Sequence, residues 1–140
     1  MNYDIEGYIR NRADNISCNW SVVCHTHPLS EDFIREMTDK LNWEFWEALV
    51  KHQKLSEKFM EEFANKLDWT NISRYQKLSC EFMDKHSDKI VWDIISWSQY
   101  FSKDFIKKYY LKIQWRLAKD FQPEAEEFIQ NFRTYGKWVV

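Results

Sequence analysis

Apolar side chains recur along this chain at a regular spacing, and each period closes on a tryptophan. Successive closing tryptophans are 23, 26, 23, 23 and 23 residues apart. They are Trp20, Trp43, Trp69, Trp92, Trp115 and Trp138. A period on the order of 20 to 50 residues is typical of repeat proteins, whose stability comes from stacked neighbours. The sequence therefore predicts an array of similar units in place of one central core.

Each unit is predicted to begin with a helix. Four stretches align without a gap from a leading apolar residue to the closing tryptophan. They are 29–43, 55–69, 78–92 and 101–115, and a degenerate fifth copy covers 124–138. Apolar residues stand four, five, eight and twelve positions after the leading residue, as Phe33, Ile34, Met37 and Leu41 do in the first copy. These spacings fall on one stripe of an α-helix but on both faces of a strand, so the unit is helical.

Recurring polar residues mark both ends of this first helix. A serine follows the leading residue, where its side-chain oxygen can accept from the free amides of the first turn. These serines are Ser30, Ser56, Ser79 and Ser102. A lysine recurs near the other end, where a cation complements the last carbonyl groups. These lysines are Lys40, Lys66, Lys89 and Lys112. Because the chain has only two glycines and two prolines, we expect long first helices with short joints.

A second, shorter helix is predicted after each tryptophan. It covers 69–76, 92–99 and 115–122, and Asp68 is suited to cap the earliest of these. The copy after Trp43 carries three extra residues and aligns best when 46–53 forms its second helix. We therefore expect a bulge or a lengthened turn at 42–45. The second helices close on a recurring polar residue: His27, Gln53, Gln76, Gln99 and Gln122.

Two-helix units of this length predict an all-α fold, an α-solenoid of about five stacked repeats in one domain over residues 1–140. Residues 1–19 are interpreted as an N-terminal cap, because a short amphipathic pattern there departs from the repeat register. Residues 20–122 hold the repeats, and 123–140 form a degenerate C-terminal repeat. The apolar end at 138–140 suggests that two chains pair end to end as a homodimer.

The repeat motif resembles a known kind of repeat. It reads Leu-Ser-x-x-Phe-(Ile/Met), six residues, Leu or Ile, one residue, Trp, then Ile-Ser-x-x-Gln, as in 78–99. This string is similar to the short helical repeats carried by proteins of phages and large DNA viruses, and it covers nearly the whole chain from Trp20 onward. The resemblance carries over no catalytic residue. It implies a viral protein whose surface engages a host protein, such as a component of a defence system.

Charge and cysteine content bear on the partner and the compartment of the protein. Lysine and arginine total 20 against 22 aspartate and glutamate, and a net charge of −2 argues against a large nucleic-acid footprint. Three scattered cysteines favour reduced thiols in a cytosol over a disulfide framework. The first twenty residues lack the apolar stretch of a signal peptide, and no segment is long enough to span a bilayer. We expect a protein of the host cell cytoplasm without membrane contact.

The sequence gives little sign of catalysis. It contains no glycine-rich phosphate loop, nucleophile elbow or paired His-Glu metal motif. His86 is the most tempting general base, but it occupies the position filled by Met37, Phe63 and Tyr109 in other copies. A core aromatic substitute is therefore the favoured interpretation of this histidine. We expect that the protein is not an enzyme and needs no cofactor.

A local group of cysteines and histidines near the N-terminus invites a metal hypothesis. It consists of Cys18, Cys24, His25 and His27, which would hold zinc only if the chain folded back tightly. The spacing is not a usual zinc pattern, and Cys24 and His27 fall on the repeat register of Ser73 and Gln76. We therefore expect no metal here.

Binding specificity is expected where the copies differ within the same geometry, because positions that recur in every copy are those that every copy needs to stack. On the second helix, the fifth and sixth positions after the aligned tryptophan vary most in character. In the central units they give a stripe of cations and aromatic rings: Lys51, His52, Arg74, Tyr75 and Trp97. Arg, Tyr and Trp commonly anchor protein interfaces, and they also stack on nucleotides. The leading hypothesis is a host-protein binder, the alternative is nucleotide or short nucleic-acid binding, and an ordinary mixed surface is the remaining interpretation.

Overall fold

The computed structural model describes residues 4–12, 18–118 and 122–136, with the backbone alone for 123 and 124. These residues form eleven α-helices, one short 3-10 helix and no strand. The all-α repeat fold of the α-solenoid type is confirmed. The chain divides into two compact units, an N-terminal unit Met1–Asn71 and a C-terminal unit Ile72–Val140. The single domain over 1–140 stays a prediction.

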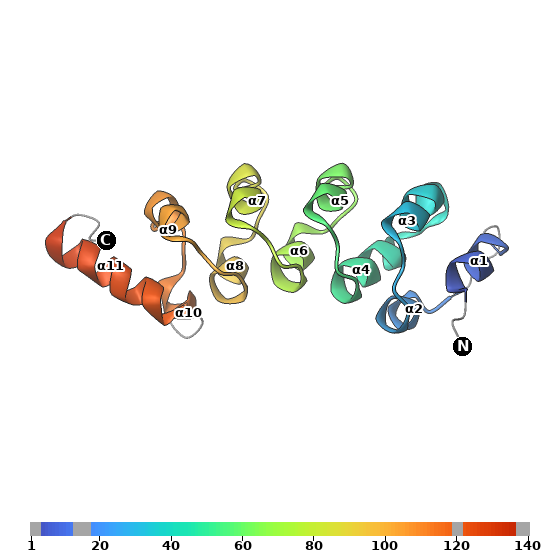
Figure 1. Ribbon diagram of the computed structural model, residues 1–140, viewed down its shortest axis with the longest axis horizontal. Coiled ribbons are helices and arrows are strands. Elements are labelled where there is room, and N and C mark those ends of the chain that lie inside the picture. Colours follow the sequence, from blue (N-terminus) through green and yellow to red (C-terminus); the bar gives the residue numbers. More distant parts are fainter. Residues whose placement is uncertain (1–3, 13–17, 119–121, 137–140) are drawn as a thin grey trace. The chain divides into compact units, whose positions relative to one another are not determined.

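In both units the first and second helices of the repeats lie in separate rows (Figure 1). The N-terminal unit contains α1 (Ile5–Arg10), α2 (Trp20–Thr26), α3 (Glu31–Met37), η1 (Thr38–Lys40), α4 (Trp43–His52) and α5 (Glu57–Glu62). Helix α6 (Trp69–Tyr75) begins in the N-terminal unit and ends in the C-terminal one. The C-terminal unit continues with α7 (Cys80–Lys85), α8 (Trp92–Ser98), α9 (Lys103–Tyr109), α10 (Trp115–Ala118) and α11 (Pro123–Tyr135). First helices are α3, α5, α7 and α9, and second helices are α2, α4, α6, α8 and α10.

The first helices start where the sequence predicts and end earlier. Ser30, Ser56, Ser79 and Ser102 each accept a hydrogen bond from the backbone amide three residues on, at 3.1 to 3.2 Å. The helices themselves have only six or seven residues, so the expectation of long helices is wrong. Tight turns follow them, as where the Lys66 amide donates to the Phe63 carbonyl at 2.8 Å. Such turns keep the apolar residues on one side, so the sequence pattern does not distinguish them from helix.

Two of the recurring lysines do not serve the helix ends as predicted, whereas Lys40 lies in the last turn of η1. Lys66 and Lys112 lie beyond the last residue of α5 and α9. Their ammonium groups instead lie over the rings of Trp46 and Trp92, 5.5 and 5.3 Å from the ring centroids. The carbonyl groups after the first helices receive indole N–H donors. Trp69, Trp92 and Trp115 donate through Nε1 to the carbonyl five residues earlier, at 2.9 to 3.2 Å.

The three extra residues after Leu41 extend a helix. Asn42 caps α4 by accepting from the Phe45 amide at 3.0 Å, and α4 has ten residues where α6 and α8 have seven. The expected bulge at 42–45 is therefore wrong, because the added residues form one more helical turn. Phe45 is buried against Trp20, with ring centroids 5.0 Å apart. Asp68 caps α6 as predicted, accepting from two backbone amides at 2.7 and 3.2 Å.

Trp46 takes the packing position that the alignment assigns to it. It is 7% exposed and lies 5.3 Å from the Phe63 ring. In the C-terminal unit Trp92 lies 4.9 Å from the Tyr109 ring, at the same spacing in sequence. Trp43 is 71% exposed and has no such role.

Glutamines at the ends of the second helices join consecutive repeats. Gln99 donates through Nε2 to the carbonyls of Ser73 and Gln76, at 3.2 and 2.7 Å, and accepts from the Leu78 amide at 2.9 Å. Gln122 similarly donates to the Gln99 carbonyl and accepts from the Phe101 amide, both at 2.7 Å. The Gln99 side chain, at the end of α8, thus bonds both to the end of α6 and to Leu78, just ahead of α7. Gln122 makes the corresponding bonds one repeat later. This explains why the residue recurs.

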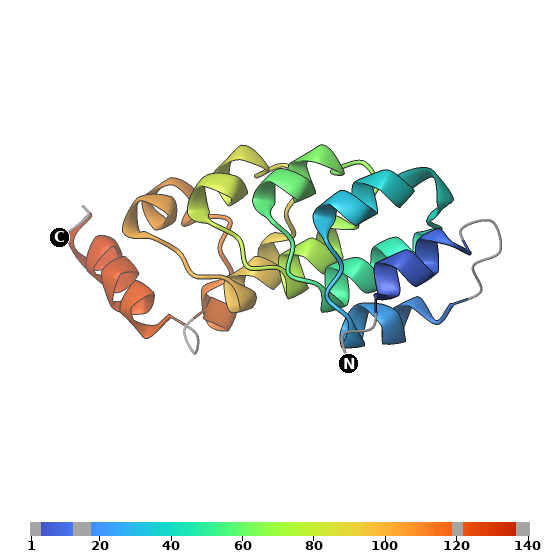
Figure 2. The same ribbon diagram turned by 45° about the vertical axis from the view of Figure 1, so that its right-hand side comes forward.

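The N-terminal helix behaves as a further first helix. Helix α1, dark blue in Figure 2, lies beside α3. Glu6 accepts from the amide and hydroxyl of Ser30 at 2.6 and 3.2 Å, as Glu31 does from Ser56 at 2.8 and 2.9 Å. Arg10 lies 5.1 Å from the Phe33 ring centroid, and Arg35 lies 5.4 Å from that of Phe59. The prediction that this segment departs from the repeat register is therefore wrong at these contacts.

The last described helix, α11, is the longest at 13 residues. It ends at Gly136, whose φ of 67° is the left-handed conformation that glycine adopts readily. The Gly136 amide donates to the Phe132 carbonyl at 2.8 Å. Residues 138–140, on which the homodimer hypothesis depends, lie outside the described residues.

Candidate partner-binding surface

The predicted stripe falls on both units. Lys51 and His52 belong to α4 in the N-terminal unit, whereas Arg74, Tyr75 and Trp97 belong to α6 and α8 in the C-terminal unit. The two groups are therefore considered separately.

Lys51 and His52 contact neighbours within their own unit. Lys51 is half-buried, and its Nζ lies 2.6 Å from Glu47 Oε1. The exposed His52 has its Nε2 3.2 Å from the Ser21 hydroxyl, and its ring lies 5.2 Å from that of His25. His52 is thus held to α2 and Lys51 to its own helix, α4. Both side chains are less available to a partner protein than the sequence predicts.

Arg74, Tyr75 and Trp97 lie on adjoining helix ends and face solvent. Arg74 is exposed, and the exposed fractions of Tyr75 and Trp97 are 46% and 41%. The final turns of α6 and α8 are joined where the Ser98 hydroxyl donates to the Ser73 carbonyl at 2.8 Å. The predicted exposure of these three residues is thus confirmed, and the turns that carry them are held together.

The structure adds residues that the sequence comparison passed over. Tyr100 is 69% exposed and follows Gln99 directly. The same position after the closing glutamine carries Lys54 and Lys77, both exposed. This position varies between the copies as the fifth and sixth positions do, so the sequence contains the signal that identifies Tyr100. Arg74, Tyr75, Lys77, Trp97 and Tyr100 are called the α6–α8 surface below.

His86 is placed as a core residue. It is 9% exposed, it follows the last residue of α7, and its ring lies 4.6 Å from that of Phe82. This packing fits the core interpretation of the histidine.

The N-terminal cysteines and histidines are not gathered into a metal site. Among the described residues, no three His, Cys, Asp or Glu side chains are grouped closely enough to hold an ion. Cys24 is buried, and burial raises the pKa of its thiol to about 12. His25 lies against His52, and Thr26 Oγ1 lies 2.8 Å from His27 Nδ1.

One carboxylate of the C-terminal unit has a perturbed pKa. Lys108 Nζ donates to Asp84 Oδ1 at 2.6 Å, and the Tyr109 hydroxyl donates to the same oxygen at 2.5 Å. These two hydrogen bonds lower the pKa of the Asp84 carboxyl below its ordinary value, because they stabilise the ionised form. The arrangement links α7 to α9 and is structural.

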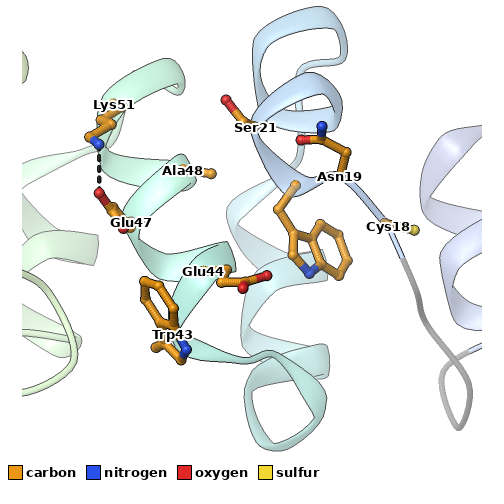
Figure 3. A pocket seen from close by; sticks show the side chains of 9 residues that line it. Cys18, Asn19, Ser21, Trp43, Glu44, Glu47, Ala48 and Lys51 are labelled. Atoms are coloured by element: carbon orange, nitrogen blue, oxygen red, sulfur yellow. Dashed lines mark hydrogen bonds and ion pairs between the residues drawn. The ribbon is translucent and has the colours of Figure 1, made fainter.

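A groove lies between α2 and α4 in the N-terminal unit. Its volume is about 550 Å³, and Trp20, Trp43, Glu44, Glu47 and Lys51 are among its lining residues. Figure 3 shows Glu44 reaching from α4 toward α2, with Trp43 at one end of the groove and Glu47 paired to Lys51. A second groove of about 590 Å³ shares Trp43 and Glu47 with the first, and Asp68 lines it as well. Trp43 therefore borders two hollows.

No protein-family model matches the chain, and no curated protein or solved structure matches it either. The resemblance to viral helical repeats stays a prediction. No helix in the described parts of the chain is both long and apolar enough to cross a membrane.

Proposed function

We propose that this is a non-enzymatic binding protein that engages another protein through the α6–α8 surface. The observation that carries the proposal is the contrast between recurring and variable positions. Trp46, Trp92 and Gln99 at the recurring positions are occupied in packing between repeats. Arg74, Tyr75, Trp97 and Tyr100 are instead exposed on two joined turns. Arg, Tyr and Trp are the side chains that most often dominate binding energy at protein interfaces.

The repeat motif favours a host protein as the partner, because it resembles repeats of phage and large-virus proteins. In this proposal the repeats form a fixed support, and the exposed side chains fill pockets on a host protein of the cytoplasm, such as a component of a defence system. A rigid support lowers the conformational entropy lost on binding.

Affinity capture from host extract tests the surface with a matched pair of variants. The test variant combines Arg74→Ala, Tyr75→Ala and Trp97→Ala, and the control combines Leu111→Ala, Arg133→Ala and Tyr135→Ala. The control residues are exposed and of similar chemical types. We expect the control variant to capture the partner as the wild type does. The test variant should bind the partner with an affinity lower by more than about tenfold, since a single hot-spot residue contributes about 2 kcal/mol or more to the binding free energy.

Helical circular dichroism should be the same for both variants, because none of the six residues is buried. Equal recovery of the partner by the two variants would place the binding surface elsewhere.

A second candidate function is binding of a nucleotide or a short nucleic acid by the same surface. The observation that favours it is the combination of Arg74 and Lys77 with the exposed rings of Tyr75 and Trp97. Bases stack on aromatic side chains, and cations contact the phosphates. A short single-stranded oligonucleotide should then raise the melting temperature, and the shift should fade with added salt. The absence of any shift at low salt rules this candidate out.

A further inference from the structure

Trp43 is the one closing tryptophan that the insertion releases from packing. The extra helical turn gives the packing position to Trp46, which is 7% exposed. Trp43 stands in the first turn of the same helix with 71% of its surface exposed. A large aromatic side chain exposed to this degree contributes little to the stability of its own unit, so its ring is available for binding.

The repeat itself shows what its tryptophan rings bind. A lysine ammonium lies 5.5 Å from the centroid of the Trp46 ring, and another lies 5.3 Å from that of Trp92. A cation is attracted to the face of an indole by the quadrupole of the ring. Within residues 4–12, 18–118 and 122–136, no lysine or arginine covers Trp43 in this way. Its ring is open to a cation from outside the protein.

The charges beside Trp43 suit such a cation. Glu44 is exposed, and in the described part of the chain its carboxylate has no ion-pair partner. Glu47, which is paired with Lys51, lines both grooves beside the ring. Asp68 and Lys66 line the second groove. The two linings together therefore carry three carboxylates and two ammonium groups. Glu44 also lies in the first turn of α4, where its charge offsets the positive end of the helix dipole. The two grooves, of about 550 and 590 Å³, leave room on either side of the ring for a chain that carries the cation.

We propose that Trp43, Glu44, Glu47 and Asp68, called the Trp43 surface, bind an arginine- or lysine-bearing segment of a partner protein. The cationic side chain lies over the Trp43 indole, and the carboxylate of Glu44 complements its charge, with Glu47 and Asp68 at the edges of the surface. This is a second surface with its own chemistry, and it does not depend on the α6–α8 surface. It assigns a basic peptide as the ligand of the N-terminal unit.

The test uses the full chain and a short peptide of alternating arginine and glycine, at a salt concentration of about 150 mM, which screens long-range attraction. A matched peptide carries citrulline in place of arginine, which keeps the planar group but removes the charge. Binding is followed by nuclear magnetic resonance through the indole N–H signal of Trp43, identified by its loss in Trp43→Phe.

We expect the arginine peptide to shift the Trp43 signal and the citrulline peptide to leave it unchanged. Trp43→Leu, which keeps apolar area but removes the ring, should weaken binding about fivefold or more. Glu44→Gln should weaken it to a smaller extent. Tyr135→Ala, which removes an exposed aromatic ring of the C-terminal unit outside both proposed surfaces, should bind the peptide as the wild type does.

Three results would overturn the proposal: no binding by the wild type, equal binding of the citrulline peptide, or unchanged affinity in Trp43→Leu. A loss of affinity in Tyr135→Ala equal to that in Trp43→Leu would show that the peptide does not select the Trp43 surface. Because Trp43 and Glu44 are exposed, these variants are expected to fold.

Discussion

Replacing Gln99 by methionine should destabilise the C-terminal unit by removing a link between consecutive repeats. Gln99 is 3% exposed and makes three hydrogen bonds to backbone groups. Methionine has a similar length and shape, but it has no hydrogen-bond donor and its thioether sulfur is only a weak acceptor. The substitution therefore changes the hydrogen bonds more than the packing.

The magnitude follows from which backbone groups lose their partner. The Ser73 carbonyl still accepts from the Ser98 hydroxyl, so it stays satisfied. The Leu78 amide and the Gln76 carbonyl lose the bonds that Gln99 makes to them, and both residues are 5% exposed. Each buried group that loses its partner costs about 1 to 3 kcal/mol, so the expected loss for the two groups is about 2 to 6 kcal/mol.

Urea unfolding followed by circular dichroism measures the loss, and amide hydrogen exchange at Leu78 locates it. The residue-level measurement matters because a chain of two units need not unfold in one step. The matched control is Gln53→Met, which removes an equivalent side chain in the N-terminal unit. Gln53 is only half-buried, so water can replace part of what is lost and the cost should be smaller. A loss below about 0.5 kcal/mol for Gln99→Met, or one no larger than that of the control, would refute this account of the glutamines.

Two further predictions concern titratable groups. Because the folded-state pKa of Asp84 is lowered, its contribution to stability is present above the unfolded value of about 3.9 and is lost as pH falls through the folded value. In Asp84→Asn the free energy of unfolding should therefore fall less steeply below about pH 4 than in the wild type. An equally steep fall in the variant would contradict the lowered pKa of Asp84. The buried Cys24 thiol, with its pKa raised to about 12, should react with a thiol reagent at pH 8 only after unfolding, whereas the half-buried Cys18 and Cys80 react in the folded protein. Rapid labelling of Cys24 in the native state would show that the burial is wrong.

The repeat architecture was predictable because it is encoded several times over. The serine caps, the apolar stripe and the recurring glutamine each appear in several copies, so a single exception does not hide the pattern. The contact of Glu31 with Ser56 of the next repeat could not be predicted, because it depends on stacking geometry. The role of Lys66 was misjudged for the same reason, because its ammonium group lies over the Trp46 ring of another helix.

Local geometry also decided where the sequence reasoning failed. The sequence pattern does not show whether three extra residues form a bulge, a lengthened turn or one more turn of helix. The cap at Asn42 shows that they belong to the helix. In the predicted stripe, Arg74, Tyr75 and Trp97 are exposed as expected, whereas Lys51 pairs with Glu47 one helical turn away. That pairing was readable from the spacing of four residues, which brings side chains together on a helix.

The central claim is that residues at the recurring packing positions hold consecutive repeats together, while exposed residues away from those positions are left for binding. Thermal and urea unfolding of Trp46→Ala and Trp43→Ala test it most directly, because the two tryptophans stand one turn apart on the same helix. The account predicts a loss of about 3 to 5 kcal/mol for Trp46→Ala and a change within about 0.5 kcal/mol for Trp43→Ala. Equal losses, or a larger loss for Trp43→Ala, would contradict it.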